Sequence, residues 1–131
     1  MLVAFAAFAV LTAQGLDLPN PRPAVECSAQ MTNPRGMRDC LRDLLREAER
    51  DLDAALEGAR EEARSSDLDS GGMFDAEGAL TRAQSAWTAY RDAECERRGA
   101  LMFISQDGRE QLVLDCQIST TRDRARELRE M

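Results

Sequence analysis

Carboxylates and thiols are the side chains that could do chemistry in this sequence of 131 residues. It carries 24 Asp and Glu, four Cys and 17 basic residues, and every basic residue is Arg because there is no Lys and no His. The absence of His excludes Ser-His-Asp and Cys-His catalysis and any His-bearing metal site, and the absence of Lys excludes Schiff-base chemistry. Hydroxyls such as Ser85 and Thr88 have no His or Lys to activate them. We therefore predict no catalytic residues and no enzymatic activity.

A loop rich in carboxylates, residues 67–78, is the one segment with spacing similar to a calcium site. Against a twelve-residue calcium loop it has Asp67, Asp69 and Asp75 at positions 1, 3 and 9 and Gly72 at position 6. Position 12, where a bidentate Glu is required, is Gly78, so two ligand oxygens are missing. The favoured interpretation is a polar turn followed by a helix N-cap at Asp75. No metal and no cofactor are predicted.

The four cysteines, Cys27, Cys40, Cys95 and Cys116, are separated by 12, 54 and 20 intervening residues. Zinc sites with four thiolates use paired C-x-x-C units, which these spacings lack. An even number of cysteines in a small exported chain instead indicates two disulfides, for which three pairings exist.

The N-terminal segment supports export. Residues 1–15 form an uncharged apolar run that ends in small residues, and we predict a signal peptide cleaved after Gly15. A buried N-terminal helix is the alternative. Residues 16–26 hold three of the four prolines and are expected to be an extended linker before a single domain at 27–131. Glu26 stands where a lipoprotein needs a small residue, so we expect a periplasmic or secreted protein with no membrane anchor.

Helical periodicity covers most of the rest. Apolar residues recur in steps of three and four from Met37 to Ala63, and Asn33-Pro34 marks the start of this first helix. Residues 65–73 are expected to form the turn after it. A second helix is predicted from Asp75 to about Arg98, ended by Gly99. A loop over residues 100–109 then leads to a third helix from about Glu110.

We predict an all-α fold, an antiparallel three-helix bundle made of a helical hairpin plus a third helix and stapled by two disulfides. The inward residues expected on the second and third helices are Leu80, Ala83, Trp87, Tyr90, Leu114, Ile118, Thr121, Ala125 and Leu128. The bundle places all four cysteines near one end, and we favour the pairs Cys27–Cys40 and Cys95–Cys116. Each disulfide is expected to contribute about 2–4 kcal/mol.

The densest cluster of distinctive residues is the segment AQSAWTAYRDAEC at 83–95, which holds the only Trp and the only Tyr. Trp87 and Tyr90 are three residues apart, which favours a core anchor over a ligand platform. Arg91 is expected to pair with a carboxylate on the first or third helix through both of its terminal nitrogens.

This segment resembles the signature of the LprI-type lysozyme-inhibitor domain family, small exported helical domains of bacteria. The resemblance spans residues 27–128. The residues that carry it are Trp87, Tyr90, Arg91 and Asp92, upstream Cys27, Thr32, Met37, Cys40, Ala48, Asp51 and Leu52, and downstream Cys116, Thr121, Arg122 and Leu128. It implies inhibition of a peptidoglycan-cleaving lysozyme. The expected role of the matched residues is to pack and crosslink the helices.

The formal net charge of −7 suits a cationic protein partner, such as a c-type lysozyme, and disfavours nucleic acid. If the domain inhibits a lysozyme, a protruding loop should enter the enzyme's cleft. The candidates are residues 66–73 and 102–109, and we favour the second, with Ser105, Gln106, Asp107 and Arg109 at its tip. Its flank carries Met102, Phe103 and Ile104, an apolar patch that could equally be core. The alternative function is a non-catalytic structural or adaptor module of the cell envelope, which would use the Arg/Asp/Glu face of the first helix.

Overall fold

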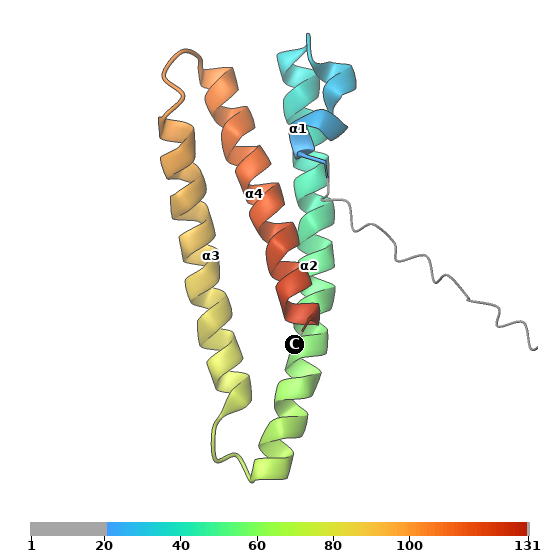
Figure 1. Cartoon of the computed structure of the whole chain (residues 1–131), viewed down its shortest axis with the longest axis vertical. Helices are drawn as coiled ribbons and strands as arrows, with labels where there is room; N and C mark the ends of the chain where they lie inside the picture. The colour runs from blue at the N-terminus through green and yellow to red at the C-terminus, as the bar shows by residue number, and fades with distance from the viewer. Residues whose placement is uncertain (1–20, 131) are drawn as a thin grey trace, which may run out of the picture.

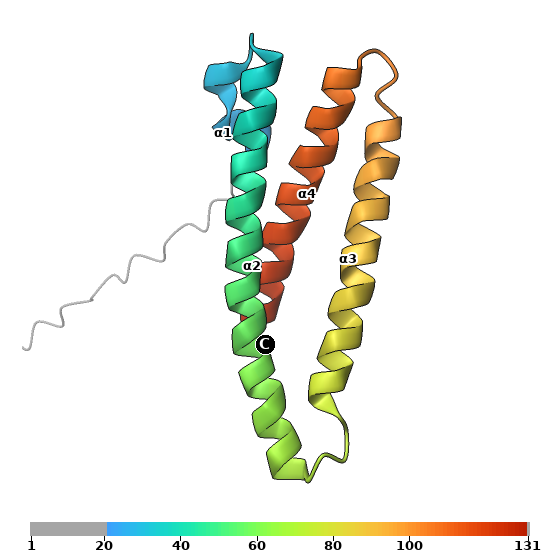
Figure 2. The same cartoon turned by 180° about the vertical axis from the view of Figure 1, so that it is seen from behind.

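The computed structural model describes residues 21–130. The expected signal peptide and the linker residues 16–20 lie outside this range. The described chain is helical with short connections, which confirms the all-α prediction. Its elements are α1 (Pro23–Glu26), the 3-10 turn η1 (Ser28–Gln30), α2 (Pro34–Ser70), α3 (Ala76–Ala100) and α4 (Gln106–Arg129). The three long helices run in alternating directions, and α4 packs mainly against α2 (Figures 1 and 2).

The start of α2 is the one that the sequence predicts. Asn33 is the N-cap and its side chain accepts a hydrogen bond from the backbone N–H of Gly36, while Pro34 occupies the first turn, where its missing N–H costs nothing. The inward stripe then runs the length of the helix. Its buried members are Met37, Leu41, Ala48, Leu52, Ala55, Leu56 and Ala63.

The end of α2 differs from the prediction, because residues 65–70 continue the helix instead of forming the turn. The helix stops only at Gly71 and Gly72, whose φ angles of 67° and 76° lie in the left-handed region that glycine adopts without strain. Asp67 stays in α2, and its carboxylate accepts hydrogen bonds from the backbone N–H groups of Ala76 and Glu77 at 2.7 and 3.1 Å. Asp75 is the N-cap of α3, as predicted.

The connection between α3 and α4 is shorter than expected. The second helix does not end at Gly99, which is buried inside α3, and α3 continues to Ala100. The third helix begins at Gln106 instead of Glu110, because the Ser105 hydroxyl caps it by accepting from the Gly108 N–H at 2.9 Å. The loop therefore contains only residues 101–105.

The described part of the expected linker is not extended. Pro23–Glu26 form one helical turn, Pro23 is buried, and the Ala24 N–H donates to Asp115 of α4 at 3.0 Å. Both disulfides have the predicted pairing. Cys27–Cys40 joins this N-terminal segment to α2, and Cys95–Cys116 joins α3 to α4, with Cα–Cα distances of 5.9 and 5.5 Å.

Two apolar clusters form the core along α2. One is built around Leu41 and Ile118, and the other around Leu52, Leu56 and Ala125. The predicted inward stripe of α4 is confirmed, since Ile118, Thr121 and Ala125 are buried and the two leucines of the stripe pack against the clusters.

The predicted stripe of α3 is wrong in part. Leu80 and Trp87 pack against the core, whereas Ala83 and Tyr90 are exposed. Among the described residues of α3 only Cys95 and Gly99 are buried. This helix therefore depends on the disulfide and on a few partly buried contacts.

Candidate functional site

Arg91 is the centre of the distinctive cluster on α3. Its guanidinium lies 5.3 Å from the centre of the Trp87 ring, and Nη1 donates to the hydroxyl of Thr121 on α4 at 3.1 Å. Nη1 is 3.7 Å from Glu49 of α2, and Nε donates to Asp92 of its own helix at 2.9 Å. The expected two-nitrogen pair with one carboxylate of another helix is therefore absent. Arg91, on α3, instead links to both other long helices through Nη1, which contacts Thr121 of α4 and Glu49 of α2.

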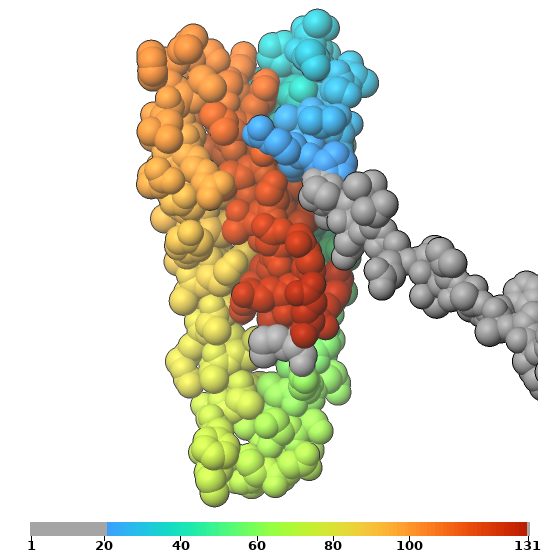
Figure 3. All heavy atoms as spheres, viewed as in Figure 1, coloured from blue at the N-terminus to red at the C-terminus, as the bar shows by residue number. Residues whose placement is uncertain are grey.

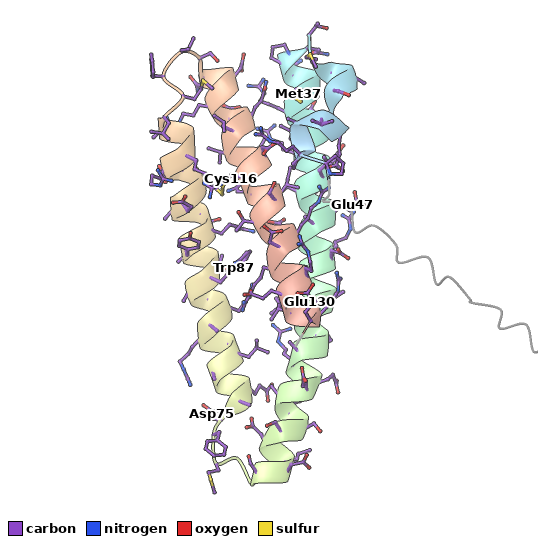
Figure 4. All side chains as sticks on the ribbon, in the orientation of Figure 1. Met37, Glu47, Asp75, Trp87, Cys116 and Glu130 are labelled. Carbon is purple, nitrogen blue, oxygen red and sulfur yellow. A yellow bond between two sulfur atoms is a disulfide. The ribbon has the colours of Figure 1, made fainter. Side chains whose placement is uncertain are left out.

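Some of the other predicted family-signature residues contact neighbouring helices, and others are exposed to solvent. Arg122 donates to both carboxylate oxygens of Glu26 at 2.6 and 3.1 Å, which raises the pKa of Arg122 and fixes α1 on α4. Trp87 and Cys116 lie in the space between α3 and α4 (Figure 4). Tyr90 is 61% exposed and Asp92 is exposed as well. The contacts of Arg91, Thr121 and Arg122 are those of residues that hold helices together.

The loop between α3 and α4 is the most exposed apolar feature at its end of the molecule. Leu101, Phe103 and Ile104 are 68%, 91% and 81% exposed, and residues 100–106 contain no charged side chain. Composition alone does not distinguish such residues from core residues. The sequence places Phe103 and Ile104 on the apolar flank of the loop, as a patch that could equally be core, and their exposure in the structure makes them, together with Leu101, functional candidates.

The four predicted tip residues separate into two pairs. Ser105 is occupied as the N-cap of α4, and Asp107 forms an ion pair with Arg38 of α2 at 3.0 Å. Gln106 and Arg109 lie in the first turn of α4 and are exposed. Both line a concave surface of about 510 Å³ beside Phe103 and Ile104. The expected surface is therefore a short apolar loop with two donor side chains at its base.

Gln106 and Arg109 also line a larger cleft of about 640 Å³ on the adjoining side of α4. Its other walls come from α2 and α3 and carry charges of both signs, including Arg42, Asp92 and Glu96. The loop and this cleft together give the α3–α4 end a continuous surface of apolar, amide and charged groups. Such a surface suits contact with another protein.

The opposite end, at the turn between α2 and α3, combines exposed apolar residues with a concentration of negative charge. Leu68, Met73 and Phe74 are exposed there. Between residues 51 and 82 three arginines face nine carboxylates, and this segment supplies most of the net negative charge of the chain. The nine are Asp51, Asp53, Glu57, Glu61, Glu62, Asp67, Asp69, Asp75 and Glu77.

Glu94 does not have the pKa of a general acid. Hydrogen bonds from Arg97 and Arg98 lower the pKa of Glu94 to about 2, whereas an acid catalyst at neutral pH needs a raised pKa. Within residues 21–130 no group of three or more carboxylates or thiols is arranged to hold a metal ion. No helix in this range is both long and apolar enough to cross a membrane.

The fold and these surfaces define a small all-α domain that is crosslinked by two disulfides and exposes apolar loops at both ends. Comparison with known families identifies it further. The family model described as lysozyme inhibitor LprI matches residues 27–128, and the chain belongs to this family. No curated protein and no solved structure matches the chain.

Proposed function

We propose that the protein is an exported inhibitor of a lysozyme-type peptidoglycan hydrolase and that loop 101–105 enters the cleft of the enzyme. Membership of the LprI family supports inhibition, and the two disulfides are consistent with export. The observation that carries the choice of surface is the near-complete exposure of Phe103 and Ile104 on a short loop whose flanking helices are joined by Cys95–Cys116.

The chemistry of the loop is compatible with a lysozyme cleft. Such a cleft contains two carboxylates beside the scissile bond, so an inserted segment should be uncharged or should bring donors. The loop has no carboxylate, and the donors of Gln106 and Arg109 stand at its base. The turn between α2 and α3 is less suitable because Asp67, Asp69 and Asp75 would approach the enzyme's own carboxylates. Crosslinked flanks also reduce the conformational entropy that the loop loses on binding.

The test is cell-wall lysis by a c-type lysozyme in the presence of the oxidised protein at micromolar concentration and low ionic strength. Inhibition is expected, and its absence would overturn the proposal for this class of enzyme. The double substitution Phe103→Ala and Ile104→Ala should weaken inhibition by at least about tenfold, since buried interface aromatics commonly contribute that much. The matched control is Met73→Ala with Phe74→Ala at the other end.

The control tests whether the enzyme is contacted by the α3–α4 loop or by the turn between α2 and α3. It removes one aromatic and one aliphatic exposed side chain, as the loop substitution does, and should leave inhibition unchanged. If the Met73 and Phe74 variant loses inhibition while the Phe103 and Ile104 variant retains it, the proposed loop is wrong. Replacing Gln106 and Arg109 with Ala tests the donors separately, and undiminished inhibition by that variant would exclude them.

A further inference from the structure

Near the turn between α2 and α3 the described chain has two long helices, where the rest of the molecule has three (Figure 1). Helix α4 ends at Arg129, whereas α2 continues to Ser70 and α3 begins at Ala76, well beyond the end of α4 (Figure 1). The part of α2 from Ala59 to Ser70 spans about 18 Å at the helical rise of 1.5 Å per residue. No segment of residues 21–130 therefore fills, beside this stretch, the position that α4 occupies farther along the bundle.

A groove of about 510 Å³ marks the unfilled position. Apolar atoms form most of its surface, which is lined by Ala59 and Ala63 from α2, Ala79, Leu80 and Ala83 from α3, and Leu128 from the last turn of α4. Openings between α2 and α3 are visible there in Figure 3. Alanine side chains let helix axes approach to about 8 Å, the short end of the usual range, so the groove has the shape for a third helix.

The charge around the groove specifies the chemistry of that helix. Glu62 and Glu127 line it, and the surrounding hairpin carries the nine carboxylates and three arginines described above. Arg124 also lines the groove and pairs with Glu127 at 2.6 Å, so these two charges cancel and Glu62 sets the sign of the lining. The C-terminal end of α4 adds the negative pole of its helix dipole. A bound helix should therefore be basic on its flanks.

We propose that this groove binds a cationic amphipathic helix of a partner protein, with an Ala/Leu face against α2 and α3 and basic residues against the acidic rim. The helix would complete the three-helix bundle where α4 ends. A second copy of the chain fits less well because its own hairpin carries the same negative charge, and like charges repel. This site is separate from loop 101–105 and does not depend on lysozyme inhibition.

The probe is a synthetic helical peptide of about 15 residues, near the length at which an isolated helix becomes stable, with an Ala/Leu face and Lys on both flanks. We expect the oxidised protein to bind it in calorimetry, with an affinity that falls as salt is raised. A peptide with the same apolar face and Glu in place of Lys should not bind. Equal binding of the two peptides would overturn the charge complementarity on which the proposal rests.

Substitutions on α3 locate the binding. Ala79→Arg with Ala83→Arg fills the groove and adds positive charge at two exposed positions, and should weaken binding of the Lys peptide at least about tenfold. Ala93→Arg, also exposed on α3 but outside the groove, is the matched control and should bind normally. Circular dichroism should show the same helix content in all three proteins. The proposal would be overturned if the groove and control variants bound the peptide with equal affinity. It would also be overturned if sedimentation showed a stable dimer that the Ala79→Arg and Ala83→Arg substitutions dissociate.

Discussion

Gly99 occupies a position in α3 where there is no room for a side chain. A Cβ built there would lie 2.5 Å from Cγ2 of Val113 on α4, and valine is stiff about χ1. Gly99→Ala should therefore lower the free energy of unfolding by about 1 kcal/mol, because overpacking of about 1–3 kcal/mol exceeds the helix propensity that alanine adds. Chemical denaturation measures the difference.

Gly58 provides the matched control for this prediction. It lies in α2, and a Cβ there would meet nothing within 4 Å. Gly58→Ala should raise the free energy of unfolding by about 0.5–1 kcal/mol through helix propensity alone. Equal stabilisation of both alanine variants would contradict this prediction, because it would mean that α4 leaves room for a side chain at position 99.

The lowered pKa of Glu94 predicts that the free energy of unfolding decreases as the pH falls. Hydrogen bonds from Arg97 and Arg98 lower its pKa from 4.5 to about 2 in the folded protein. A depressed folded pKa contributes stability above the unfolded pKa of about 4.5, and this contribution is lost as the pH falls toward 2. Glu94→Gln should therefore reduce stability at pH 6 and have little effect near pH 2. Glu96→Gln, which removes an exposed carboxylate without an ion pair among the described residues, should not show this pattern.

At the scale of elements, the packing of α3 relies more heavily on a disulfide, Cys95–Cys116, than the packing of α2 does. Cys95 and Gly99 are its buried residues in the described chain, whereas α2 has seven. Replacing Cys95 and Cys116 with Ala should cost about 2–4 kcal/mol and speed amide hydrogen exchange along α3. The corresponding Cys27 and Cys40 variant should leave the exchange of α3 nearly unchanged. Unaltered protection of α3 after loss of Cys95–Cys116 would show that packing alone holds it.

The elements also show what the sequence could predict. The helices and the disulfide pairing follow from local patterns, namely apolar steps of three and four and cysteines near helix ends. The sequence does not predict the continuation of α2 from Ser65 to Ser70, because serine and aspartate are weak helix formers. The helix stops only where Gly71 adopts a left-handed conformation. The exposure of Tyr90 and Phe103 depends on how the helices face one another, and no local pattern contains that information.

At the scale of the whole molecule, the two proposed surfaces lie at opposite ends. The uncharged loop 101–105 follows the end of α3, and the acidic hairpin turn precedes its start, so α3 separates them by about 37 Å at 1.5 Å per residue. The Debye length at physiological ionic strength is about 8 Å. The carboxylates close to this turn therefore act little on an enzyme held at the loop. The overall charge of −7 can attract a cationic enzyme only at low salt.

Neutralising the acidic hairpin should separate the two activities. Glu61→Gln, Glu62→Gln and Asp69→Asn remove charge from exposed positions on the last turns of α2 without changing side-chain size. At physiological salt this variant should inhibit lysozyme as the parent protein does, because the loop is several Debye lengths away, but it should bind the Lys-flanked peptide at least about tenfold more weakly. Lysis assays and calorimetry on the same preparation measure both. Loss of inhibition in this variant would place the enzyme contact on the hairpin instead of the loop.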